Sequence, residues 1–169
     1  AREAGVSVGV LYQRFKDKRG FFEIIVDALA EQLNSEIDEF FLAAEAAETA
    51  WDLPKLIERV VASLVAMVER DVGFFVALIT IGDQVPGTLG KVAVVDRHRA
   101  QALHRYALAN RLIDPAAVDE ARIYFALATA IRMLLVTATV DREPIRLRDP
   151  STLEGLAAML TGYLQPPKT

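Results

Sequence analysis

Residues 1–22 read AREAGVSVGVLYQRFKDKRGFF, and they carry the signals for two short helices followed by the start of a long one. Ser7 is a suitable N-cap for a helix over Val8–Phe15, because its hydroxyl can accept a hydrogen bond from a free backbone N–H of the first turn. Gly5 is placed to end a preceding helix over Ala1–Ala4. Two short helices joined by three residues predict a helix-turn-helix.

The predicted helix Val8–Phe15 has one face for packing and one for solvent. Val8, Leu11 and Phe15 fall on the same side, so we expect them to pack on neighbouring helices. The outward side presents Val10, Tyr12, Gln13 and Arg14. In a major groove, Gln pairs with adenine, Arg with guanine and Val touches a thymine methyl group, with about 1–3 kcal/mol of discrimination per bidentate pair. A Tyr hydroxyl can reach a backbone phosphate. The pattern therefore predicts a recognition helix for double-stranded DNA.

Positive charge is concentrated at the same end of the chain. Residues 1–19 contain five basic and two acidic residues, a net charge of +3, whereas the whole chain carries −4. A positive tip on a negative body is the polarity expected if only that end meets phosphate. Lys18 and Arg19 lie in the first turn of the next predicted helix, where cations oppose the helix dipole unless an anion is bound. A solvated basic patch is the simpler interpretation, but after a helix-turn-helix the pattern favours DNA contact.

Residues 1–22 closely resemble the DNA-binding signature of the TetR family of transcriptional regulators. The resemblance implies that Gly5 is the turn glycine and that Tyr12 and Lys18 contact phosphates. The family's first helix has no counterpart here, so we expect residues upstream, and Val10 stands where many members carry Thr. We expect the DNA-binding residues to be Ser7, Val10, Tyr12, Gln13, Arg14, Lys16 and Lys18.

Beyond this motif the apolar spacing is helical nearly throughout, and no segment alternates as a strand does, which predicts an all-α fold. We expect a partial helix-turn-helix DNA-binding head over residues 1–20 and a helical effector-binding and dimerisation domain over residues 21–169. A hydrophobic content of 53%, with 9 Gly and 7 Pro, supports a large helical core. The chain has no Cys, which excludes disulfides and thiolate metal sites and suits the cytoplasm.

A long helix is predicted to connect the head to the body. It begins after Asp17 and carries an apolar stripe to about Ala47, a length of roughly 45 Å at ~1.5 Å per residue. Motion at one end of such a helix must be felt at the other. Further helices are predicted over residues 54–70, 72–82, 89–110, 116–140 and 151–164. Asp114 and Pro115 are expected to be the N-cap and the first residue of the fourth of these.

The predicted helix 116–140 is apolar on nearly every side. Arg132 lies at the centre of its most apolar part and disfavours a membrane span by about 2.5–3.5 kcal/mol. A helix that is apolar all round must be buried on two sides, and the simplest second surface is the same helix of a twin subunit. With the last helix it would form a four-helix interface, as in TetR-like proteins. The predicted dimer contacts are Leu127, Ile131, Leu134, Leu156, Met159, Leu160 and Tyr163.

The family resemblance also implies an effector pocket between the long helix and the helices that follow it. Aromatic residues and Met at helical spacing are more often plain core, but these are the candidates for its lining. Few charged groups fall on these faces, so a largely apolar effector is expected. The predicted pocket residues are Trp51, Met67, Phe74, Phe75, Leu78, His98, Tyr106 and Tyr124.

Two other patterns point to chemistry that the sequence does not support further. Gly5–Gly9 matches G-x-S-x-G, but a nucleophile elbow needs a preceding strand, and the residues before Gly5 are predicted to be helical. His98 and His104 are six residues apart, about 240° around a helix, so they cannot hold one metal from one face.

We therefore expect a TetR-type regulator, a repressor that binds operator DNA as a homodimer and is released by a small effector, with no enzymatic activity, cofactor or membrane partner. The alternatives are a helical ligand-binding or interaction module without DNA binding and, in the enzyme class, a G-x-S-x-G hydrolase.

Overall fold

The computed structural model describes residues 18–47, 51–81, 85–139, 147 and 149–165, and within these ranges the chain is all-helical, with six helices and no strand. The all-α prediction is confirmed for this part of the chain. The helices are α2 (Lys18–Glu45), α3 (Leu53–Arg70), α4 (Val72–Ile81), α5 (Thr88–Ala109), α6 (Glu120–Thr139) and α7 (Pro150–Leu164). Apart from the start of α6, their ends fall within two residues of the predicted bounds.

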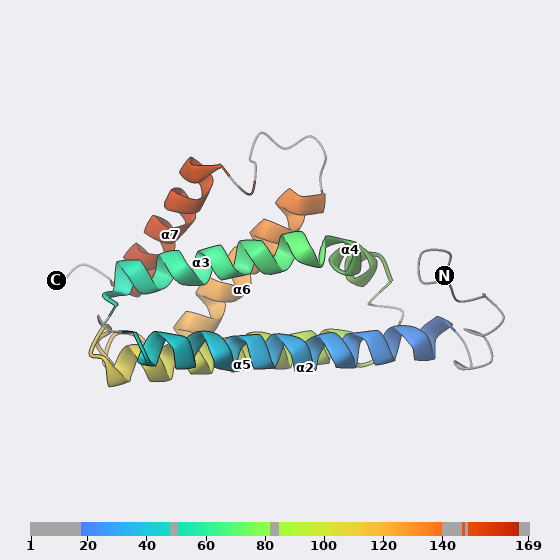
Figure 1. The fold of residues 1–169 in the computed structure, drawn as a ribbon, viewed down its shortest axis with the longest axis horizontal. Helices are drawn as coiled ribbons and strands as arrows, with labels where there is room; N and C mark the ends of the chain where they lie inside the picture. The colour runs from blue at the N-terminus through green and yellow to red at the C-terminus, as the bar shows by residue number, and fades with distance from the viewer. Residues whose placement is uncertain (1–17, 48–50, 82–84, 140–146, 148, 166–169) are drawn as a thin grey trace.

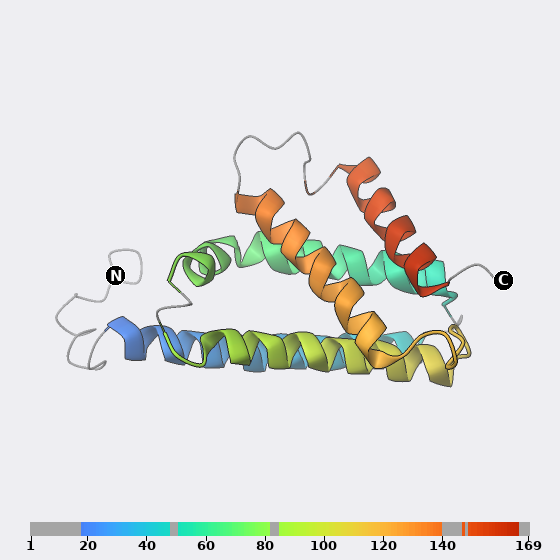
Figure 2. The same cartoon turned by 180° about the vertical axis from the view of Figure 1, so that it is seen from behind.

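Helices α2 and α5 lie side by side and form the long base of the molecule (Figures 1 and 2). α2 has 28 residues, which at ~1.5 Å per residue gives about 42 Å. Three contacts follow the same order along both helices, namely Asp27 with Lys91, Asp38 with His98, and Ala44 with Tyr106. The two helices are therefore parallel. α3, which lies between them in the sequence, runs in the opposite direction (Figure 1).

One side of α3 is buried in the core along the whole helix. Asp52 caps its start by accepting a hydrogen bond from the Lys55 backbone N–H at 2.9 Å, and Pro54 occupies the first turn, where a missing N–H costs nothing. Its inner residues, including Leu56, Ile57 and Leu64, are almost wholly buried. α3 packs against α7 and α6, and α4 follows it directly after Asp71.

The start of α6 differs from the prediction. Asp114 accepts a hydrogen bond from the Ala116 N–H at 2.9 Å, and its carbonyl accepts from Ala117 and Val118, so residues 114–118 form turns and do not begin the helix. The cap is Asp119, whose side chain accepts from the Arg122 N–H at 2.8 Å. Both aspartates are good caps by residue type, and the second one stands at the observed helix start.

α6 and α7 form a second pair that lies across α3 (Figure 2). Asp149 caps α7 through the Ser151 N–H at 3.1 Å, with Pro150 as the first helical residue. Arg122, near the start of α6, donates two hydrogen bonds to the Tyr163 carbonyl at 2.8 and 3.1 Å and lies 4.5 Å from the centre of that ring. This contact satisfies a free carbonyl at the end of α7 and fixes the two helices antiparallel.

Among the described residues, α6 is long and apolar enough to cross a membrane by length and composition. The core helix of a compact protein passes the same test. The inner face of α6 is part of the common core, through Ile123, Leu127, Ile131 and Leu134.

Candidate ligand-binding cavity

Two adjoining cavities lie between α2, α3, α5 and α6. The first has a volume of about 110 Å³ and is lined in part by Glu36, Phe40 and Leu64. The second has a volume of about 50 Å³ and extends toward α4. The two share three lining residues: Leu33 of α2, Met67 of α3 and Arg99 of α5. These side chains therefore stand between the two spaces.

Among the described residues, Arg99 is the one charged residue that is buried, with only 8% of its side chain exposed. Its Nη1 donates to the Asp96 carboxylate at 3.2 Å, and that carboxyl is itself only 14% exposed. Burial lowers the pKa of Arg99, against the opposing effect of Asp96 and Glu36. Burial likewise raises the pKa of Asp96, against the charges of Arg99 and Arg132. For both side chains, the attraction of the opposite charge therefore does not fully offset the cost of removing the charged group from water.

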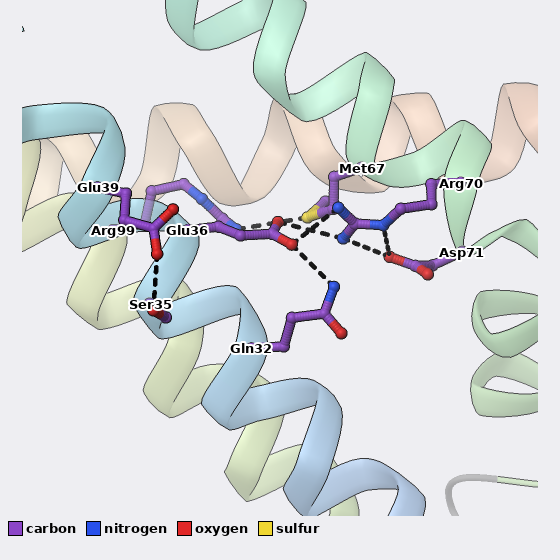
Figure 3. A network of polar contacts seen from close by, with 8 residues as sticks. All are labelled: Gln32, Ser35, Glu36, Glu39, Met67, Arg70, Asp71 and Arg99. Atoms are coloured by element: carbon purple, nitrogen blue, oxygen red, sulfur yellow. Dashed lines mark hydrogen bonds and ion pairs between the residues drawn. The ribbon is translucent and has the colours of Figure 1, made fainter. Parts of the chain in front are cut away.

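The other terminal nitrogen of Arg99 faces a poor acceptor. Nη2 lies 3.5 Å from the sulfur of Met67, a contact that crosses from α5 to α3 (Figure 3). A thioether accepts hydrogen bonds only weakly. A guanidinium carries five N–H donors in a fixed fork. One carboxylate oxygen and one sulfur therefore accept only a small part of the hydrogen bonds that Arg99 can donate.

A polar clamp joins α2 to α3 beside the first cavity (Figure 3). Both terminal nitrogens of Arg70 donate to Glu36, at 2.8 and 3.1 Å, and Gln32 donates to the same carboxylate at 2.8 Å. Arg70 is also held by Asp71 at 2.7 Å. Burial alone would raise the pKa of Glu36, but the hydrogen bonds from Gln32 and Arg70 hold it below its ordinary value. The hydrogen bonds to Asp71 and Glu36 raise the pKa of Arg70.

The second cavity is apolar apart from Asp96 and Arg99 at one side. Its wall is formed by Phe74, Phe75 and Leu78 of α4 with aliphatic residues of α2, α5 and α6. Phe74 stacks on Phe22 of α2, with the ring centres 6.0 Å apart. This end of the cavity suits hydrocarbon and offers it no hydrogen bond.

The structure brings four of the eight predicted pocket residues to these cavities. Met67 lines both, and Phe74, Phe75 and Leu78 line the second.

The other four predicted pocket residues do not line these two cavities. Trp51 packs edge-on against Phe40 from outside, and Tyr124 is half-buried against the core. His98 bonds to Asp38 on the outer side of the α2–α5 pair. Tyr106 donates to the Ala44 carbonyl at 3.3 Å, which ties α5 to the end of α2.

Glu36, Asp96 and Arg99 are the charged cavity residues that sequence reasoning missed. Arg99 continues the buried stripe of Val95, Ala102 and Leu103 on α5. A charged residue at a core position with an acidic residue three places earlier is the signal that could have found it.

The predicted DNA contacts Ser7, Val10, Tyr12, Gln13, Arg14 and Lys16 lie outside the described residues, as does the whole G-x-S-x-G motif. Lys18 is the first residue of α2.

Most predicted dimer contacts are placed in the subunit's own core. Buried there are Leu127, Ile131, Leu134, Leu156 and Leu160. Helical periodicity turns these residues inward, onto α3 and α5, so they are not available at the surface. Of the predicted set, Met159 and Tyr163 are exposed, and Phe125 and Val136 of α6 are exposed as well.

Among the described residues no group of three or more His, Cys, Asp or Glu is placed to hold a metal ion. No protein-family model, curated protein or solved structure matches the chain.

Proposed function

We propose that the protein is a ligand-responsive transcriptional regulator of the TetR type, a repressor that binds operator DNA as a homodimer and releases it when a small, largely apolar molecule enters the cavities. The proposal is supported by the resemblance of residues 1–22 and, above all, by one observation. α2 begins at the end of that motif and forms a wall of both cavities. In the sequence, α2 thus follows directly on the predicted DNA-binding motif, and it reaches the proposed ligand space.

The mechanism is a population shift. A molecule that fills the space between α2 and α3 favours a conformation in which these helices stand further apart. Because α2 is a single long helix, a small tilt at the cavity is a larger displacement at its amino-terminal end. Two recognition helices set for successive turns of the major groove then lose their spacing.

Homodimerisation is supported by apolar side chains left exposed on α6 and α7. Phe125 is 60% exposed and Met159 50%, and Val136 and Tyr163 are exposed on the same two helices. A second copy related by a two-fold axis would cover these residues by pairing α6 and α7 with their twins. A dimer also supplies the second recognition helix that a two-fold symmetric operator requires.

The test is the binding of full-length protein to a labelled duplex from its own promoter, measured by fluorescence anisotropy beside a shuffled duplex. The proposal predicts tighter binding to the promoter and a steep loss of affinity with salt, about −0.9 in the log–log slope per phosphate contact. Equal, weak binding to both duplexes would favour the helical interaction module instead. Turnover of simple esters that is lost in Ser7→Ala would favour the hydrolase.

A further inference from the structure

Arg99 and Met67 belong to the partition between the two cavities, together with Leu33. Both residues line both spaces, and the Nη2 to Sδ contact of 3.5 Å joins them. The Met side chain has three rotatable bonds and no branch, so it can change rotamer at small cost. Arg99 is less free to move, because its other terminal nitrogen donates a hydrogen bond to Asp96 on the same helix.

Each of the two cavities is small for a ligand. They measure about 110 and 50 Å³. A cavity of ~150 Å³ admits a benzene molecule, so neither space alone holds much more than a small fragment. If the Met67 side chain turned away, the two spaces would join beside Leu33 and Arg99, from Glu36 at one end to Phe74 and Phe75 at the other.

We infer that this joined space binds an amphipathic carboxylate, whose carboxylate replaces the Met67 sulfur as the acceptor for Arg99 while its hydrocarbon part occupies the apolar cavity beside Phe74, Phe75 and Leu78. The inference rests on the proposed function in treating the cavities as the effector site. It adds the class of effector and the residue that moves to admit it.

The guanidinium of Arg99 favours an anionic acceptor over a cation or a neutral group. The guanidinium fork matches the two oxygens of a carboxylate, whereas an alcohol oxygen engages it only in part. Glu36, which lines the first cavity, is already bonded to Arg70 and Gln32, which reduces its repulsion of an incoming anion. An ammonium group would instead be repelled by the Arg99 guanidinium, which is buried and therefore little screened by solvent.

The direct test is calorimetric titration of the full-length protein with straight-chain carboxylates of four to eight carbons and with the alcohols and amines of the same lengths. At the best length the carboxylate should bind at least about tenfold more tightly than the alcohol, because hydrogen bonds to a charged group exceed neutral ones. The amine should not bind. Equal binding of acid and alcohol, or binding of no carboxylate, would overturn the inference.

Three variants separate the roles of Met67 and Arg99. Met67→Ala leaves the cavities joined and should bind the carboxylate more tightly than wild type, whereas Met67→Leu keeps a side chain of similar volume and should not. Arg99→Lys keeps the charge but removes the fork, and it should weaken the carboxylate at least tenfold with the alcohol unchanged. If Arg99→Lys fails to fold, the Met67 pair decides, and equal affinities in that pair would contradict the inference.

The operator is left out of these titrations so that the two proposals can fail separately. If the protein binds DNA with sequence preference but binds no carboxylate, only the inference of a carboxylate site is contradicted. Carboxylate binding by a protein that prefers no DNA sequence supports the ligand site and removes the regulator.

Discussion

Glu36 of α2 and Arg70 of α3 are joined by two hydrogen bonds, of 2.8 and 3.1 Å, which form a bidentate bridge between the first described helix and the helix that carries Met67 (Figure 3). The two side chains are 37% and 45% exposed. The bridge therefore links α2 to α3 beside the first cavity, while solvent screens much of its energy.

Glu36→Gln should destabilise the subunit by less than about 1 kcal/mol, because the pair is partly exposed. The loss should depend on pH. The pKa of Glu36 is lower in the folded state than its ordinary value of 4.5, so its contribution is present above that value and is lost as pH falls through the folded-state pKa.

Urea unfolding of wild type and Glu36→Gln at several pH values measures this difference, which should be largest near neutral pH and vanish in acid. Glu39→Gln is the matched control, since Glu39 lies on the same helix and accepts from Ser35 at 3.2 Å. A difference between Glu36→Gln and wild type that does not change with pH would contradict the assignment of the bridge.

Neighbouring residues of α7 should separate core packing from surface. Leu160 is 2% exposed and belongs to the core between α7 and α3, while Met159 is 50% exposed. Leu160→Ala should cost about 2–5 kcal/mol in the free energy of unfolding. Met159→Ala should change it by no more than about 0.5 kcal/mol at protein concentrations where the chain is monomeric. Thermal or urea unfolding gives both values, and equal losses would mean that the faces of α7 are wrongly assigned.

The exposed apolar face of α6 and α7 should control self-association. Phe125→Glu places a charge on that face, and sedimentation velocity should show the dimer converted to monomer, because an unpaired charge is costly in an apolar interface. Leu42→Glu is the control, since Leu42 is equally exposed but lies on α2, which packs mainly against α5. If both variants remain dimeric, or if both dissociate, the interface is not on α6 and α7.

Helix positions could be predicted from the sequence because local signals set them. Asp52 with Pro54, and Asp149 with Pro150, mark the starts of α3 and α7, which lie within one residue of the predicted starts at residues 54 and 151. The start of α6 could not be predicted, because Asp114 and Asp119 are equally good caps and the choice between them is made by tertiary packing. The first forms a turn instead.

The cavity could be predicted only in part. Its apolar residues on α4 follow from helical spacing, but the shared position of Met67 and Arg99 depends on how three helices meet. Leu127 illustrates the same limit for the dimer: periodicity marks it as apolar and buried, and only the packing of α6 on its neighbours says that it is buried within its own subunit.

The two classes of proposed DNA contact should respond differently to substitution. Gln13→Ala should weaken binding to the preferred duplex by about 1–3 kcal/mol and relax the preference at one base position. Lys18→Ala should weaken binding to every duplex alike and reduce the salt slope by about one. Anisotropy titrations on the preferred duplex and on single-base variants of it distinguish these outcomes. Identical behaviour of the two variants would argue against the assigned roles.

Selection of duplexes from a random pool by the full-length protein tests most directly whether the amino-terminal motif of a two-fold dimer reads DNA sequence. We expect enrichment of a two-fold symmetric sequence with half-sites about one helical turn apart, near 10 base pairs or a multiple of it. A pool that remains random after repeated selection at moderate salt would contradict it.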